Sequence, residues 1–288
     1  NKAMQDHDLE DLIEVPLILM YIIALWCDGK SITESKSKLY TSIIELLLSR
    51  TLKKYSDLEI TPESSQCELP QCFSDHGNCK KYSTLIIALG KLALHTLFSE
   101  KRENSLVFNR SVVEHYLGQE QLKLCLLSGI LTENKVMKCS KDISRISFSH
   151  KTVQEYFTAV YSSCQPQEKV VKTITEKCKS IQDILDMKIL LVFISGMNPE
   201  IVSSISHELK SVINNDEITC NYRTLTYNKH MYIDPLQDIQ NMLISRMKEC
   251  NQNKEVKLCL QDFFITEKCQ QGNNFKLLQE LCHQNKEN

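Results

Sequence analysis

Apolar residues recur at helical spacing along most of the chain, and this pattern predicts a mainly α-helical protein. Pro16 opens an apolar run over residues 17–26, and proline is well tolerated in a first helical turn because its missing N–H is not needed there. A second amphipathic helix is predicted over residues 38–54. The periodicity then lapses among Pro, Gly, Ser and Cys between residues 55 and 81, which indicates a surface loop.

Three short helical segments followed by a hairpin predict a winged helix over residues 83–163. The three segments span residues 83–98, 109–118 and 119–128. Residues 130–148 then carry apolar runs on either side of polar residues, which is typical of a short β-hairpin. Thr152 and Glu155 have the spacing of a capping box, so a helix with one apolar face is expected to begin there.

The rest of the chain, from Pro166 onward, alternates helical segments with polar connectors and predicts a second helical domain. Helical segments of this kind are predicted at residues 181–194, 199–213, 243–250 and 258–264. No repeat of fixed period is visible, which argues against a complete solenoid. The predicted order is a helical domain at 1–55, a Cys-containing loop at 56–82, a winged-helix domain at 83–163, a second helical domain at 164–270 and a tail or the start of a further region at 271–288.

Composition and charge narrow the classes of function. The chain has 288 residues, of which 42% are hydrophobic and 24% charged, as in ordinary globular proteins. Its formal net charge of -2 supplies no general attraction for nucleic acid or anionic lipid, so neither is an expected partner. The longest apolar run, residues 15–27, is shorter than the roughly 17–25 residues that span a bilayer, so we expect a core helix and no membrane partner.

The cysteines and the first residues of the chain indicate in which cellular compartment the protein is expected. Thirteen cysteines form an odd set with irregular spacing, and many of them sit within helical apolar patterns. We therefore expect reduced thiols and a cytoplasmic protein. The chain starts at Asn1 with polar and acidic residues, so no secretory signal is expected and further sequence is expected upstream.

Residues 24–31 (ALWCDGKS) satisfy a relaxed phosphate-loop pattern. A phosphate loop needs a small, flexible chain whose amides wrap the phosphates, whereas Trp26 and Asp28 bring bulk and negative charge. The preceding run also resembles a helix rather than a strand. We therefore predict a turn between two helices at this position.

Cys67, Cys72, His76 and Cys79 lie in one loop and offer the four ligand types of a zinc site. Their spacing is unusual for zinc, so a polar loop with incidental thiols is the favoured interpretation and no metal is expected. Motifs of nucleophilic and metal-dependent hydrolysis, such as Gly-x-Ser-x-Gly and His-Glu-x-x-His, are absent from the sequence. No catalytic residue is predicted.

His150 is the histidine most suited to binding, because it directly precedes the start of a predicted helix. Unpaired amides and the helix dipole favour an anion at such a position, and an imidazole N–H can donate to a phosphate oxygen. A purely structural histidine is the competing interpretation, and composition and spacing alone favour it.

Four segments over residues 9–161 occur in an order that resembles the downstream half of a NACHT module, as found in NOD-like receptors. They are the segment 9–26 with VPLIL at 15–19, the segment 29–50, LGKLA at 89–93 with Phe108 and LLSGIL at 126–131, and FSHKTVQEYFTA at 148–159. The resemblance implies a signalling switch of the STAND class of ATPases. In such proteins ADP holds the module closed, and exchange for ATP opens it for oligomerisation.

The resemblance also implies roles for two residues. Pro16 matches the proline that packs near the adenine, and His150 matches the winged-helix histidine that contacts the nucleotide phosphate. The phosphate loop and the magnesium site of the family have no counterpart in this chain, so it is not expected to be an enzyme or to bind ADP or ATP tightly. The nucleotide would be bound by an upstream nucleotide-binding domain of the same parent chain.

The resemblance further implies a cytoplasmic protein of innate immune sensing that forms homo-oligomers on activation. Two alternatives remain open. The chain could be a helical scaffold that binds other proteins through exposed helices. A DNA-binding winged helix is the weaker alternative, because its recognition helix at 119–128 offers only Lys123 as a basic residue.

Overall fold

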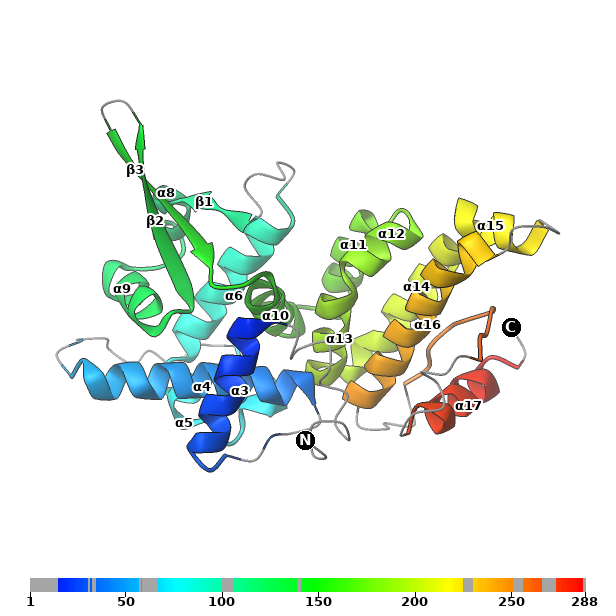
Figure 1. Cartoon of the computed structure of the whole chain (residues 1–288), viewed down its shortest axis with the longest axis horizontal. Coiled ribbons are helices and arrows are strands. Elements are labelled where there is room, and N and C mark those ends of the chain that lie inside the picture. The colour runs from blue at the N-terminus through cyan, green and yellow to red at the C-terminus, as the bar shows by residue number, and fades with distance from the viewer. Residues whose placement is uncertain are drawn as a thin grey trace. The chain divides into compact units, whose positions relative to one another are not determined.

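The protein is mainly helical and carries one small antiparallel sheet (Figure 1). The computed structural model describes residues 15–30, 32, 35–56, 58, 67–99, 106–138, 141–224, 230–250, 256–265 and 273–286. The chain divides into two compact units, Asn1–Cys164 and Gln165–Asn288. The predicted fold class, mainly α with a small β-hairpin, is confirmed.

Among the described residues of the first unit, the first two helices pack against each other. They are α3 at Pro16–Cys27 and α4 at Lys36–Lys54. Ile18, Ile22 and Leu25 of α3 are buried, because residues three or four apart share one face of a helix.

Within the described residues, no helix has both the length and the apolar character needed to cross a membrane.

Part of the segment expected to be a surface loop is helical and packed, which corrects the prediction for residues 67–81. It contains η1 at Gln71–Phe73 and α5 at Gly77–Lys81. Phe73 and Cys79 are buried. The carboxylate of Glu45 on α4 accepts the backbone N–H groups of Asn78 at 3.2 Å and Cys79 at 2.9 Å, so a distant residue satisfies the free amides of α5. Local periodicity cannot reveal such a partner.

The middle of the first unit has the connectivity of a winged helix (Figure 1). Its described elements are α6 at Ser83–Leu97, β1 at Phe108–Asn109, α8 at Arg110–Glu114, α9 at Gln119–Ser128, β2 at Leu131–Lys138 and β3 at Lys141–Phe148. The strands are antiparallel in the order β1-β3-β2, with Phe108 opposite Ile146 and Leu131 opposite Phe148. The predicted hairpin is confirmed, while the short strand β1 was not predicted.

Helix α10 at Lys151–Ser163 follows the hairpin and packs closely along α6. At Gly90 of α6, an added Cβ would lie 2.6 Å from Cβ of Tyr161 and 2.9 Å from the carbonyl oxygen of Phe157. Ordinary carbon contacts are about 3.5–4 Å, so only glycine permits this approach of the two helices. The approach brings α10 and its first residues into a defined position against α6.

The second unit is a helical bundle. Its elements are α11 at Gln167–Lys177, α12 at Ile181–Asp186, α13 at Lys188–Met197, α14 at Pro199–Asn215, α15 at Glu217–Thr224, α16 at His230–Glu249 and α17 at Asn274–Gln284. The apolar helix α13 is buried along most of its length and packs on α14 and α16.

Two predictions for the second unit were wrong in detail. The helix expected over residues 181–194 is broken at Met187 into α12 and α13. The segment 258–264, expected to be helical, has no helix and forms part of an irregular stretch over residues 256–265. Its backbone groups bind side chains of distant helices instead of each other, which is described below.

Candidate functional site

His150 is the N-cap residue of α10. Its backbone is extended, with φ of -154° and ψ of 154°, and its Nδ1 accepts the backbone N–H of Thr152 at 3.2 Å. The predicted capping box of Thr152 and Glu155 was therefore wrong, because Thr152 already lies inside the helix. Glu155 is 3% exposed, and its carboxylate lies 3.5 Å from Nζ of Lys151.

A chain of hydroxyl groups holds the imidazole of His150. The hydroxyl of Tyr40 on α4 donates to Oγ1 of Thr152 at 2.7 Å, and Oγ1 of Thr152 lies 2.9 Å from Nδ1 of His150. Because the proton of Tyr40 occupies one side of Oγ1, the threonine proton is free to be donated to Nδ1. The contacts thus connect α4 to the first turn of α10.

These contacts select one tautomer of His150. Nδ1 accepts hydrogen bonds, so the proton of the neutral ring lies on Nε2. Burial lowers the pKa of His150, and the positive charge of Lys151 lowers it further. Near neutral pH, His150 is therefore an uncharged donor through Nε2. No hydrogen bond from Nε2 to another described residue occurs.

Further polar contacts fix α10 against its neighbours. The hydroxyls of Thr41 and Tyr156 lie 2.8 Å apart, and the rings of Tyr40 and Tyr156 stack with centroids 5.6 Å apart. Tyr156 is fully buried, and burial raises its pKa well above the usual value. His150 is thus carried by a rigid pair of helices rather than by a free loop.

Pro16 lies in the first turn of α3 and begins an uncovered apolar face. Pro16, Met20, Ile23 and Cys27 follow one another at spacings of four, three and four residues, and all four are exposed. Met20 is 53% exposed, Ile23 is 49% exposed and the adjacent Trp26 is 70% exposed. Large apolar side chains that gather on one exposed face mark an interaction surface.

The structure places the two predicted site residues at the beginnings of different helices, Pro16 on α3 and His150 on α10. A pocket of about 420 Å³ in this unit is lined by neither of them. Tyr40 and Thr152 were not predicted as part of the site. Tyr40 lies within the second resembling segment, but only the folded chain shows that its hydroxyl reaches the first turn of α10.

The phosphate-loop pattern at residues 24–31 folds as the turn between two helices, as predicted; Ser31 lies outside the described residues. Gly29 has a φ of 69°, and the N–H of Lys30 donates to the carbonyl of Leu25, so the backbone turns back onto α3. The carboxylate of Asp28 pairs with Arg50 of α4 at 2.9 Å. The backbone N–H groups of Asp28, Gly29 and Lys30 therefore donate to carbonyl groups of α3 instead of surrounding a phosphate.

The described residues do not gather the zinc ligands considered above. Among them, no group of three or more His, Cys, Asp or Glu side chains has the arrangement needed to hold a metal ion. Of the four candidates, Cys79 is fully buried, and burial raises its pKa well above the usual value, whereas a zinc ligand must be a thiolate. Cys67, Cys72 and His76 are partly exposed.

No family model matches the chain, and no curated protein shows a significant match to it. The resemblance to NACHT modules therefore rests on the four sequence segments alone.

Proposed function

We propose that this chain is the regulatory helical and winged-helix part of a NACHT-type, nucleotide-dependent signalling switch, and that it acts in the cytoplasm, in innate immune sensing. It couples the nucleotide state of an upstream domain of the parent chain to opening and homo-oligomerisation. The chain itself is not an enzyme under this proposal, and ADP or ATP is held by the parent. Nucleic acid has no part in it.

The observation that carries the proposal is the geometry of His150. The side chain sits at the start of a helix of 13 residues, is neutral near neutral pH and has Nε2–H as its remaining donor. A phosphate oxygen of ADP is the acceptor that this site suits, because the hydrogen bond would be charge-assisted and the helix dipole would add to it.

The contacts around His150 explain how nucleotide state could reach the rest of the unit. Tyr40 and Thr152 link the imidazole to α4, and Gln154 donates to Thr96 of α6 at 2.8 Å. A force on His150 is thus transmitted to both helices that flank α10. Loss of the phosphate contact would release the winged helix as a rigid body.

The exposed face of α3 supports an upstream partner domain. Its apolar residues Met20, Ile23 and Trp26 continue from Pro16, which the family resemblance places near the adenine. A nucleotide-binding domain that covers this face would bury these side chains and bring the nucleotide to Pro16.

The decisive experiment compares His150→Ala and His150→Asn in the full-length parent. Loss of a charge-assisted hydrogen bond is worth about 1.5–3 kcal/mol, so both variants should release ADP roughly 10- to 100-fold faster. Asn is a good N-cap whereas Ala is not, so only His150→Ala should also lower the melting temperature. Unchanged ADP retention and unchanged signalling in both variants would contradict the proposal.

A second experiment tests whether the upstream domain, and not this chain, binds the nucleotide. Isothermal titration of residues 1–288 with ATP or ADP should show no tight binding, because the phosphate-binding parts belong to the upstream domain. Micromolar affinity of this chain alone would mean that the domains have been assigned wrongly.

A further inference from the structure

Residues 256–265 of the second unit form an extended segment, here called the strap, that lies among helices. Alternate side chains of its first half, those of Val256, Leu258 and Leu260, are 6%, 1% and 5% exposed. Lys257 between them is exposed. This period of two is that of a β-strand with one buried face, although the strap pairs with no other strand among the described residues.

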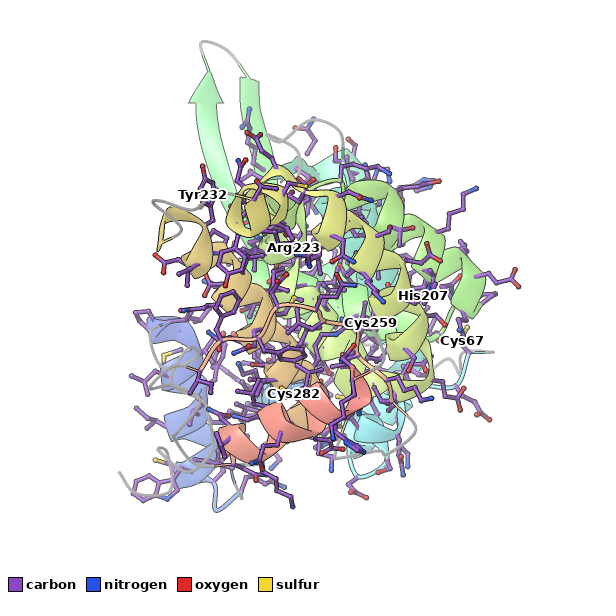
Figure 2. The ribbon with its side chains drawn as sticks, turned by 90° about the vertical axis from the view of Figure 1, so that its right-hand side faces the viewer. Cys67, His207, Arg223, Tyr232, Cys259 and Cys282 are labelled. Atoms are coloured by element: carbon purple, nitrogen blue, oxygen red, sulfur yellow. The ribbon has the colours of Figure 1, made fainter. Side chains whose placement is uncertain are left out.

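One edge of the strap is satisfied by serine hydroxyls of α14. The backbone N–H of Lys257 donates to Oγ of Ser203 at 2.9 Å, and the N–H of Cys259 donates to Oγ of Ser206 at 2.8 Å. Successive odd residues of a strand present their N–H groups to the same edge, and the three-residue spacing of the serines places both on one face of the helix. Figure 2 shows the face of the unit that carries the strap and labels Cys259 of the strap.

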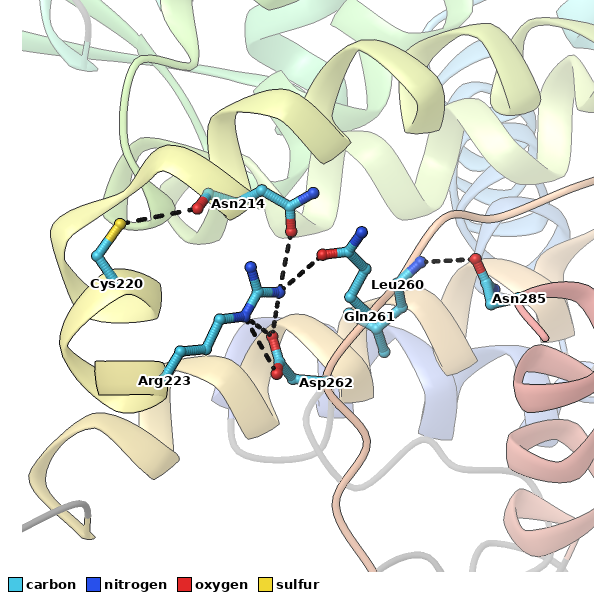
Figure 3. A network of polar contacts seen from close by, with 7 residues as sticks. All are labelled: Asn214, Cys220, Arg223, Leu260, Gln261, Asp262 and Asn285. Carbon is cyan, nitrogen blue, oxygen red and sulfur yellow. Dashed lines mark hydrogen bonds and ion pairs between the residues drawn. The ribbon is translucent and has the colours of Figure 1, made fainter. Parts of the chain in front are cut away.

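The opposite edge is satisfied by amide side chains at the end of α17. Gln284 accepts the N–H of Leu258 and donates to the carbonyl of Val256, both at 3.2 Å. Asn285 accepts the N–H of Leu260 at 3.1 Å (Figure 3). It also donates to the carbonyl of Leu258 at 2.8 Å. The strap and α17 therefore bind each other and form one piece, here called the arm.

The arm is held by groups that recognise main chain. Besides the two serines, Gln240 of α16 accepts the N–H of Phe264 and donates to its carbonyl, both at 2.8 Å. Such bidentate contacts depend on the extended backbone and not on which copy of the chain supplies it.

One charged contact adds specificity for this sequence. Arg223 of α15 contacts the carboxylate of Asp262 at 2.6 Å, and its guanidinium also donates to Gln261 at 2.9 Å and to Asn214 at 3.1 Å (Figure 3). The side chains of Arg223 and Asp262 are 33% and 19% exposed, so either residue can be substituted without disrupting the buried core.

We propose that the surface of α14, α15 and α16 that holds the arm also receives the arm of a second copy of this chain, so that two copies exchange arms. The strap of any copy presents its backbone groups and Asp262 at the spacing that Ser203, Ser206, Gln240 and Arg223 bind. A reciprocal exchange refills both surfaces and restores at each the backbone hydrogen bonds described above. In the sequence, five residues, 251–255, separate Cys250 from the strap. This interface is independent of nucleotide and goes beyond the proposed switch.

The test uses a charge reversal split between two full-length chains. A chain with Arg223→Asp and a chain with Asp262→Arg each place like charges together when the arm binds its own copy. In a mixture, exchanged arms restore an opposite-charge contact at both surfaces. Native mass spectrometry should therefore show a dimer fraction about tenfold higher in the mixture than in either variant alone, taking two exposed contacts of about 0.7 kcal/mol each.

The double variant Arg223→Asp with Asp262→Arg is the matched control, because it restores the contact within one chain and should show no such excess. Circular dichroism establishes that each variant is folded. Equal dimer fractions in the mixture and in the single variants would overturn the proposal. Independently, mixing Arg223→Cys and Asp262→Cys chains under mild oxidation should give disulfide-linked peptides that contain positions 223 and 262. Absence of this peptide pair would also overturn the proposal.

Discussion

Gly90→Ala tests the close packing that positions His150. The added methyl group would lie 2.6 Å from Cβ of Tyr161, 2.9 Å from the carbonyl oxygen of Phe157 and 3.3 Å from the backbone N of Tyr161. Two of these three atoms belong to the backbone of α10, so no rotamer change can relieve the contact. Helices α6 and α10 must therefore move apart by up to about 1 Å to reach ordinary carbon contact distances.

The size of the effect follows from two opposing contributions. Alanine is a better helix former than glycine, which favours the variant by about 1 kcal/mol. Overpacking of a close-packed core costs about 1–3 kcal/mol, and the upper end applies when backbone atoms are in the way. We therefore expect a net loss of about 2 kcal/mol in the free energy of unfolding of the first unit, with a melting temperature lower by about 4–8 °C.

Differential scanning calorimetry of the full chain measures this shift. The matched control is Gly77→Ala in α5, because an added Cβ at Gly77 has no heavy atom within 4 Å, so the same substitution lacks the clash there. The control should leave the melting temperature unchanged or slightly raised. A melting temperature of Gly90→Ala within about 1 °C of the parent would refute the argument that this contact requires glycine.

Three further predictions concern buried and titratable groups. Arg246 is fully buried, and one of its terminal nitrogens has no partner, so Arg246→Met should raise the free energy of unfolding by about 1 kcal/mol in urea denaturation; a loss would contradict this. The pKa of His150 is lowered, so its contribution to stability is complete above its usual pKa near 6.5 and is lost as pH falls through the folded value. An NMR titration midpoint above 6.5 would have the wrong sign. With a maleimide, exposed Cys27 should react fast and buried Cys79, whose pKa is raised, should react slowly; equal rates would show that the burial is wrong.

Sequence pattern was sufficient where the decisive interactions are local. The helical spacing of apolar residues predicts α3 and α4, and proline in a first turn places the start of α3 correctly. The apolar runs on either side of polar residues over 130–148 predict β2 and β3. In these cases the apolar pattern of a single element is visible in a short window of sequence.

Tertiary structure decided the elements whose backbone groups are satisfied from far away. The N-terminus of α5 is capped by Glu45, which lies 33 residues before Asn78. The start of α10 depends on His150 and on the hydroxyl of Tyr40, 112 residues before Thr152, rather than on the capping box that the sequence suggested.

The clearest case is the segment 258–264, whose composition suits a helix but whose structure is extended. A helix satisfies its own N–H and carbonyl groups, and this segment gives up that advantage because Ser206, Gln240 and Asn285 supply equivalent hydrogen bonds. From the sequence by itself come the helical class, the hairpin and the candidate histidine. Which donors and acceptors meet depends on contacts between residues far apart in the chain, so only the folded protein determines the cap of α10, the uncovered face of α3 and the strap.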